Sequence, residues 1–309
     1  MSNASTSSSA SPAPYLLPTG KVLACLDDSP YAEAVCDFGA WSASRLTSPL
    51  SFLHVLETTS GNVVGGRNLS GAIGLGARED LLEELATLDE QRSRLAMEGG
   101  RLLLEAARTR AQRMAPELEE ATQRIETRQR HGELVDALVA LEPETRMLVV
   151  GKRGAASAGD HGHLGRHLEQ VIRTVGRPIL VAQQVFAPPK AIMFAWDGSP
   201  TARKGVEMVA ASPLFRGIPC HLVYVGSDRP EAREGLAQAQ RTLEAAGFEA
   251  PTALVPGNPD EALPGYQEAH GLDLLIMGAY GHSRIRRMIL GSTTTAMLRS
   301  CRVSVMVLR

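Results

Sequence analysis

The same order of apolar runs and turn residues occurs twice in this chain, and this internal repeat limits the possible folds more than any other feature. The apolar run at residues 21–26 ends in Asp-Asp-Ser-Pro, and the run at 191–196 ends in Asp-Gly-Ser-Pro. A helical pattern and a second apolar run follow each of them. Self-similarity on this scale in a chain of 309 residues indicates two copies of one structural unit.

Each copy predicts five strands that alternate with helices. The apolar runs at 147–150 and 274–277 are the predicted fourth strands, and each leads into glycines, a helix and a last short strand. Such alternation is typical of an α/β fold in which helices cover both faces of a parallel sheet. With right-handed crossovers, we expect two tandem doubly wound parallel sheets related by an internal pseudo-twofold.

The repeat also predicts the domain boundaries. We expect a disordered tail rich in Ser, Ala and Pro at residues 1–18, a first domain at 19–184 and a second domain at 188–309. The first domain carries an insertion at about 57–90. Its glycines, from Gly61 to Gly76, are too many for a helix interior, but the sequence from Arg78 to beyond Arg110 predicts a long charged amphipathic helix. The insertion could fold over a ligand or a partner, or be a solvated excursion.

Composition argues against several classes of function. A net charge of −2 and 4% aromatic residues give no support to a nucleic-acid partner, and no apolar run is long enough to span a membrane. The four cysteines are dispersed, as expected of buried thiols in a reducing compartment. Residues 1–18 lack the basic start and apolar core of a signal peptide. We therefore expect a cytoplasmic protein without membrane or nucleic-acid partners.

The clearest candidate site follows the apolar run at 274–277. Gly278 and Gly281 come after this predicted strand, and Gly291 and Ser292 open the next predicted helix. Glycines let the backbone approach a ligand, and the free N–H groups of a helix's first turn attract anions. Three arginines, at 284, 286 and 287, add positive charge between them. These features predict a phosphate-binding site.

The commonest nucleotide motifs are missing from the sequence. The nearest approach to G-x-x-x-x-G-K-[ST] begins at Gly61 and lacks both the lysine and the hydroxyl. No G-x-G-x-x-G follows the first predicted strand of either half, and no G-x-S-x-G is present. The sequence therefore argues against a P-loop, a dinucleotide fold of the usual kind and a serine nucleophile elbow.

The spacing of the candidate residues resembles a known pattern. Gly278-x2-Gly281-x9-Gly291-Ser292, with Asp-Gly-Ser-Pro at 197–200 after an earlier strand, resembles the ATP-binding motif of the universal stress protein family. The resemblance covers residues 21–182 and 190–309, so the chain is similar to a tandem universal stress protein. It implies an adenine nucleotide alpha hydrolase-like sheet of order 3-2-1-4-5 in each half. The fifth strands, which mediate dimerisation in the family, would pair the two halves as an intrachain pseudo-dimer.

The resemblance also implies one ATP site in the second half. The residues that match the motif are Ala195, Trp196, Asp197, Val225, Met277, Gly278, Gly281, Gly291, Ser292 and Thr293. By this resemblance, backbone at two strand ends holds adenine, Asp197 binds the ribose hydroxyls or a metal such as Mg²⁺, and Met277 lines the pocket. The glycines of the motif, together with Ser292 and Thr293, would then bind the phosphates. On its own, the segment 197–200 is better interpreted as a turn and a helix cap.

The first half departs from the pattern. Gly154 and Gly165 are separated by ten residues, one more than in the second half, and Arg166 replaces the hydroxyl. Arg166 could bind a phosphate or fill the anion site with its own cation, so we expect a degenerate or differently used site. This loop also holds acidic and imidazole side chains, namely Asp160, His161, His163 and His167. The i,i+4 histidines could bind a metal, but solvated loop histidines are the simpler interpretation.

Three functions remain open from sequence alone. The first is a stress-response protein that binds ATP as a regulatory ligand, with slow hydrolysis at most, because no general base or Walker-type lysine accompanies the motif. The second is a partner-binding module with vestigial nucleotide sites, in which the insertion contacts another protein; a homodimer is also open. The third, an adenylate-transferring enzyme, lacks the signature motifs that such relatives require.

Overall fold

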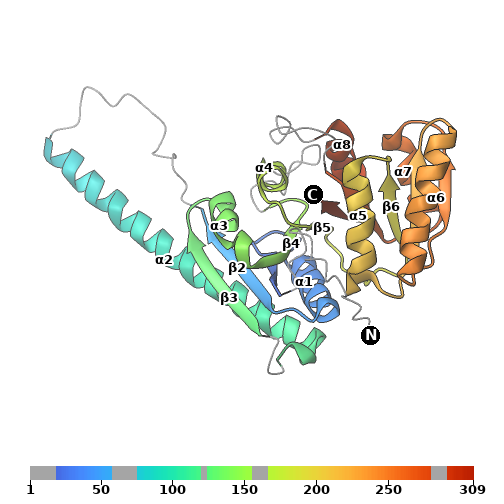
Figure 1. The fold of residues 1–309 in the computed structure, drawn as a ribbon. Helices are drawn as coiled ribbons and strands as arrows, with labels where there is room; N and C mark the ends of the chain where they lie inside the picture. Colours follow the sequence, from blue (N-terminus) through green and yellow to red (C-terminus); the bar gives the residue numbers. More distant parts are fainter. Residues whose placement is uncertain (1–18, 58–74, 120–123, 155–165, 280–290) are drawn as a thin grey trace, which may run out of the picture.

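One continuous ten-stranded sheet with helices on both faces forms the centre of the protein (Figure 1). The computed structural model describes residues 19–57, 75–119, 124–154, 166–279 and 291–309, and of residues 75–83 and 166 only the backbone. The strand order is β3-β2-β1-β4-β5-β10-β9-β6-β7-β8, which is the order 3-2-1-4-5 from either edge. Neighbouring strands are parallel except at the central pair of β5 and β10, which is antiparallel. The predicted fold is confirmed, and the two sheets join through their fifth strands.

Within the described residues, each half contributes five strands and four α-helices in the same order. The first half supplies β1 (Lys21–Cys25), α1 (Ala32–Leu46), β2 (Leu50–Leu56), α2 (Leu75–Met114), β3 (Ile125–His131), α3 (Leu134–Leu141), β4 (Thr145–Gly151), α4 (Arg166–Thr174) and β5 (Ile179–Ala182). The second half supplies β6 (Ile192–Trp196), α5 (Pro200–Ala211), β7 (Cys220–Val225), α6 (Pro230–Ala245), β8 (Thr252–Val255), α7 (Pro259–Ala269), β9 (Leu274–Gly278), α8 (Ser292–Ser300) and β10 (Ser304–Leu308). A 3₁₀ turn, η4 (Pro213–Phe215), follows α5.

The two faces of the sheet carry separate apolar cores. Alternate strand residues point to opposite faces, so β1 directs Val22 and Ala24 to one core and Leu23 to the other. We call the first the α1 face, since it is covered by α1, α2, α5 and α6. The α4 face is covered by α3, α4, α7 and α8. Strands buried on both faces explain the near-continuous apolar runs of the sequence.

The long helix α2 has 40 residues and projects beyond the sheet (Figure 1). Its second half packs against the body through Gly100, Leu104, Ala107 and Ala111, all buried, whereas residues 84–99 are all exposed. The predicted long helix is confirmed, but it already begins at Leu75, so the assignment of Gly76 outside a helix was wrong. Glycine is well tolerated near helix N-termini, where its interior penalty is reduced. Within the described ranges, no helix has the length and apolarity of a membrane span.

A bidentate ion pair fastens α2 to α1. Arg110 donates from Nε and Nη2 to the carboxylate of Asp37 at 2.6 and 2.8 Å, and its Nη1 lies 3.0 Å from Glu33. Asp37 is buried, while the guanidinium of Arg110 remains partly exposed. The pair therefore satisfies a carboxylate that the α1–α2 contact removes from water.

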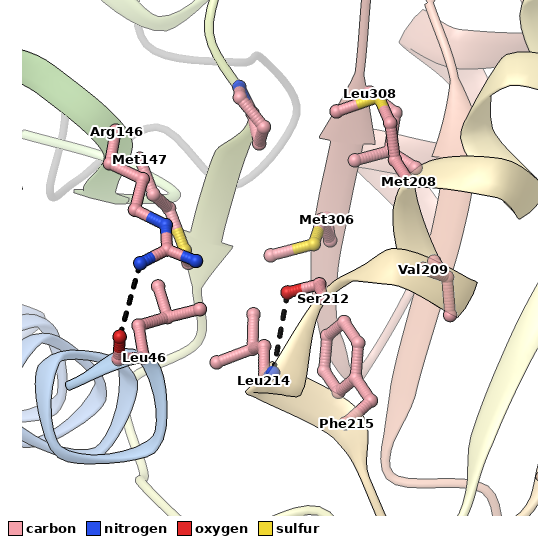
Figure 2. Close-up of a pocket in the computed structure, with 11 residues that line it drawn as sticks. Leu46, Arg146, Met147, Met208, Val209, Ser212, Leu214, Phe215, Met306 and Leu308 are labelled. Carbon is pink, nitrogen blue, oxygen red and sulfur yellow. Dashed lines mark hydrogen bonds between the residues drawn. The ribbon is translucent and has the colours of Figure 1, made fainter. Parts of the chain in front are cut away.

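On the α1 face, the halves meet around a small apolar cavity (Figure 2). The cavity has a volume of about 50 Å³ and is lined from both halves, with Met147 and Leu46 facing Met306 and Phe215. Arg45 strengthens this contact by donating from Nε to the Leu214 carbonyl at 2.9 Å. The cavity is far below the several hundred Å³ of ordinary ligand pockets, and the predicted site residues that the structure describes are not among those that line it. It is therefore a packing gap between the halves and not the predicted nucleotide site.

On the α4 face, each half caps a helix of the other. Lys152 donates to the carbonyls of Arg299 and Cys301 at the end of α8, at 3.1 and 2.8 Å. Arg309 donates to two carbonyls at the end of α4, at 2.9 and 2.7 Å. Cations at helix C-termini satisfy the last carbonyls and complement the helix dipole. Lys152 therefore joins the two halves, although it comes from the glycine loop of the first, and burial lowers the pKa of its ammonium.

A small polar cluster links β7 to α7. Nδ1 of His221 lies 3.1 Å from Oη of Tyr266, whose ring stacks on His270 with centroids 3.9 Å apart. Burial first, and then the charge of His270, lowers the pKa of His221, while Glu249 raises it. His221 therefore binds a proton less readily in the folded protein than in the unfolded chain.

We expect this cluster to make the protein less stable in acid. A histidine whose folded pKa is depressed reduces stability as pH falls below its unfolded value of about 6.5, because the unfolded chain then binds more protons. His221→Gln should therefore flatten the decline in the free energy of unfolding between about pH 7 and pH 5, measured by urea denaturation at several pH values. An unchanged slope would show that His221 does not contribute.

Candidate functional site

The predicted site residues of the second half that the structure describes lie at one edge of the sheet. β6 pairs in parallel with β7 and β9, and Ala195 lies opposite Met277. The carboxyl ends of these strands therefore lie side by side, which places Asp197, Val225 and Gly278 at the same edge. The chain crosses over in opposite directions on the two sides of β6, and ligands of doubly wound sheets bind at such a point.

Apolar side chains approach this edge on the α4 face. Ala195 and Val225 are half-buried and pack against the same cluster as the buried Met277. Trp196 points the other way: it is buried on the α1 face, where a Cβ added to Gly235 of α6 would lie 3.7 Å from its ring. At this edge Trp196 can therefore offer only its backbone, whereas the other three offer an apolar surface.

Asp197 is exposed and held by a tight turn. Its Oδ1 accepts the N–H of Ser199 at 2.9 Å, and the turn passes through Gly198 with φ +74°. Ser199 in turn caps α5 by accepting the N–H of Ala202 at 3.1 Å. The interpretation of segment 197–200 as a turn and helix cap is confirmed. The same turn fixes the carboxylate beside the strand end.

Gly278 has a packing role of its own. A Cβ at this position would lie 3.0 Å from Cγ2 of Thr201, in the first turn of α5. The equivalent glycine of the first half, Gly151, is under the same constraint, since its Cβ would lie 2.8 Å from Cβ of Tyr31. Close approach of a helix to the strand end thus requires glycine here whether or not a ligand binds.

The first turn of α8 is open at its N-terminal end. Gly291 is the N-cap and makes no side-chain cap, and the first turn closes with the N–H of Thr295 donating to the Gly291 carbonyl at 3.0 Å. The N–H groups of residues 292–294 therefore have no acceptor within the helix, and the side chains of Ser292 and Thr293 are exposed. Such a turn suits an anion.

Part of the predicted phosphate loop lies outside the described residues. These positions are Gly281, Arg284, Arg286 and Arg287 in the second half, and Asp160, His161, His163 and Gly165 in the first. Arg166 begins α4, but its side chain is not described either. Among the residues that are described, no three acidic, histidine or cysteine side chains gather in a way that could hold a metal ion.

In the first half, the strand-end aspartate and the glycine loop approach each other. Oδ1 of Asp27 accepts the N–H of Ser29 at 3.1 Å, as in the equivalent turn of the second half. A Cβ added to Gly154 would lie 2.9 Å from Oδ2 of Asp27. The two ends of the motif therefore meet at one edge of the sheet, although the sequence separates them widely.

A contact between a histidine and a carboxylate spans this edge in the first half. Nδ1 of His167 lies 2.8 Å from Oε1 of Glu57, which joins the first turn of α4 to the end of β2. By the strand and helix registers, the second half has Thr293 and Ser227 at these positions. The interpretation as a solvated loop histidine therefore does not hold for His167, and sequence reasoning missed Glu57. Comparing the repeats position by position would have shown that a glutamate and a histidine in the first half replace two small hydroxyl residues of the second.

The comparisons with known proteins agree with this architecture. The model of the universal stress protein family matches residues 18–183 and 189–309. Universal stress protein Slr1230 of Synechocystis sp. is 35% identical over 290 residues, which cover 93% of this chain and 99% of that protein.

Solved structures support the fold. The crystal structure of a universal stress protein from Archaeoglobus fulgidus matches with a TM-score of 0.66 at 19% identity, over 94% of this chain and 98% of that one. A putative universal stress protein from Pseudomonas aeruginosa matches with a TM-score of 0.58 at 14% identity, over 94% of this chain and 93% of that one. Identities this low show the fold alone, whereas the two family-model matches and the Synechocystis relative show the family. The chain therefore belongs to the universal stress protein family, and each half matches the family model.

Proposed function

We propose that this protein is a stress-response protein that binds ATP as a regulatory ligand in its second domain, at residues 188–309, with a first domain at 19–184. What supports the proposal is that Asp197 and an apolar surface lie at the carboxyl ends of β6, β7 and β9, and that the chain leaves β9 at this edge to enter α8 through an open first turn. Membership of the family supports it, and the spacing of these residues resembles the family's ATP-binding motif.

Each part of ATP finds suitable chemistry at this edge. Adenine would lie against Ala195 and Val225, with backbone groups at the strand ends available for hydrogen bonds. The carboxylate of Asp197 would accept hydrogen bonds from the ribose hydroxyls or bind Mg²⁺ together with the phosphates. The open first turn of α8, with Ser292 and Thr293, would take the phosphates.

We expect ATP to act as a ligand more than as a substrate. Fast phosphoryl transfer needs cations on the phosphates and a group that orients the attacking water. The lysine of the first glycine loop, Lys152, is committed to carbonyls of α8, and its counterpart after β9 is Ala279. The arginines at 284, 286 and 287 could supply positive charge, but no general base accompanies the motif in the sequence, so any hydrolysis at this site would be slow.

The free thiols fit a reducing compartment such as the cytoplasm. Cys25, Cys36, Cys220 and Cys301 are all unbonded. Burial raises the pKa of the first three to about 12, which makes them unreactive. Oxidising compartments favour disulfides, so this usage supports a cytoplasmic location.

Isothermal titration calorimetry on protein freed of carried-over nucleotide tests the proposal. We expect saturable ATP binding with one site per chain, because Glu57 and His167 span the edge of the first half. Asp197→Asn keeps the oxygen that accepts from Ser199 but removes the charge, and should weaken binding about tenfold, or about 1.4 kcal/mol. The matched variant Asp27→Asn in the first half should leave the affinity unchanged.

Three outcomes would count against the assignment. Absence of saturable binding would reject ATP as the ligand, and two equivalent sites would reject its restriction to the second half. Equal effects of Asp197→Asn and Asp27→Asn would reject the role of Asp197. Gly281→Asp provides a further check, since a carboxylate among the phosphates should abolish binding.

A second candidate is a partner-binding stress module with vestigial nucleotide sites. The exposed residues 84–99 of α2 favour it, since their side chains form an exposed helical surface, and the bond from Gln129 of the body reaches only the backbone carbonyl of Met97. Deleting residues 61–76 separates the two functions. Loss of the stress phenotype with ATP binding intact would favour partner binding, whereas a preserved phenotype would favour the ATP-regulated function.

A further inference from the structure

The helix α8 runs from the ligand edge of one half to the ligand edge of the other. It connects β9 to the parallel strand β10, so it starts near the carboxyl end of β9 and ends near the amino end of β10. Because β10 is antiparallel to β5, that amino end lies beside the carboxyl end of β5. The first turn of α8 is therefore at the proposed ATP site, and its last turn is at the corresponding edge of the first half.

The last turn of α8 is held by side chains of the first half. Nζ of Lys152, in the glycine loop after β4, donates to the carbonyls of Arg299 and Cys301 at 3.1 and 2.8 Å. Nε2 of Gln183, directly after β5, donates to the same Cys301 carbonyl at 2.8 Å. Lys152 is buried, so these bonds replace those that its ammonium would make to water.

The described part of the second half's glycine loop makes no equivalent contact. The residue that corresponds to Lys152 is Ala279, which has no side-chain donor and whose N–H pairs with the Leu308 carbonyl of its own half. The end of α4 is held instead by Arg309, the last residue of the sequence. The two helices are thus capped in different ways, and only α8 is capped from a glycine loop.

The first turn of α8 depends on how the rest of the helix is held. Its first two side chains are exposed, and no side chain caps it. The bond from the Thr295 N–H to the Gly291 carbonyl, at 3.0 Å, closes this turn. The helix is anchored further along, where Met297 and Leu298 are fully buried in the core of the α4 face.

We propose that Lys152 is a positioning residue for the phosphate site of the second half, so that the first half sets how tightly that site binds phosphate. This inference rests on the proposed function. Bonds to the last carbonyls fix α8 along its axis, and a rigid helix carries that position to its first turn. The charge of Lys152 acts in the same direction: it lies about one helix length, or 13 Å, from the first turn, and burial limits the screening of its attraction for phosphate.

Isothermal titration calorimetry with ATP and with adenosine tests the proposal. Lys152→Met removes the charge and the donor but keeps an unbranched side chain. It should weaken ATP binding about tenfold and leave adenosine binding unchanged, because adenosine has no phosphate. Lys152→Arg should keep the affinity for ATP, since a guanidinium can donate to the same carbonyls. A lysine with a merely structural role would affect the two ligands equally.

Arg309→Met is the matched control. It removes a cation from two carbonyls at the end of α4, so urea denaturation should show a loss of stability comparable to that of Lys152→Met. The affinity for ATP should nevertheless stay at the wild-type value, because α4 belongs to the first half. An equal loss of ATP affinity in both variants would overturn the proposal.

Hydrogen exchange without nucleotide separates this inference from the proposed function. Lys152→Met should speed exchange of the Thr295 amide, in the first turn, as well as that of the Cys301 amide at the end of the helix. Faster exchange at Cys301 alone, or ATP binding that Lys152→Met leaves unchanged, would overturn the role of Lys152. Absence of ATP binding to the wild-type protein would instead reject the proposed function, and exchange at Thr295 would still show whether Lys152 positions the first turn.

Discussion

Gly100→Ala is expected to destabilise the protein by about 1–3 kcal/mol, the usual cost of overpacking a core. A Cβ on Gly100 would lie 2.5 Å from Cδ2 of His54 and 2.7 Å from Nε2 of Gln129. Gln129 could move if it gave up its bond to the Met97 carbonyl, but His54 is buried, with its Nδ1 2.8 Å from the Leu26 carbonyl. The clash must therefore lift α2 from β2.

The neighbouring glycine provides the control. Gly99 is exposed, and no atom of the described residues lies within 4 Å of the position of an added Cβ. Gly99→Ala should therefore stabilise the helix by up to about 1 kcal/mol through helix propensity. Urea denaturation followed by circular dichroism measures both effects. Effects of the same sign at these adjacent positions would contradict the close docking of α2 at Gly100.

Arg110→Ala is expected to cost about 2–4 kcal/mol, because it leaves the buried carboxylate of Asp37 without its bidentate partner. Asp37→Asn should cost less, about 1 kcal/mol, since the partly exposed guanidinium of Arg110 can turn to water and to Glu33. Removing both partners together should cost less than the sum of the single changes, a difference that a double-mutant cycle measures.

The double-mutant cycle also identifies the cause of the loss. If the effect of Arg110→Ala came only from lost packing of the arginine side chain, the two single changes would add up, and no coupling with Asp37 would be measured.

Most of the fold could be predicted from sequence because its signals are local. Apolar runs, the turn after β6 and the Pro at the start of α5 each depend on neighbouring residues. Contacts between the halves could not be predicted in this way. Lys152 comes from a loop that looks suited to phosphate, yet its partners are carbonyls at the end of α8. The residues next to Lys152 in the sequence do not indicate that it binds these carbonyls.

The candidate site was predicted only as a set of positions. Asp197 and Gly278 both have structural roles, in a turn and against Thr201, so residue type alone cannot separate packing from ligand binding. The pair of Glu57 and His167 requires the end of β2 to meet the start of α4, which only the folded sheet reveals. The direction of the Trp196 side chain likewise follows from strand register and not from composition.

The union of β5 and β10 within one chain has a consequence for how the two halves can differ. Identical subunits of a dimer dissociate on dilution and exchange partners. Each subunit must therefore carry all the residues that the functions of the dimer require. A covalent link keeps the halves at an effective concentration of about millimolar, however dilute the protein is. The first half has Glu57 and His167 where the second half has Ser227 and Thr293. Because the halves are joined within one chain, every molecule contains one edge of each kind. The two different halves therefore cannot exchange partners to form symmetric dimers of identical halves.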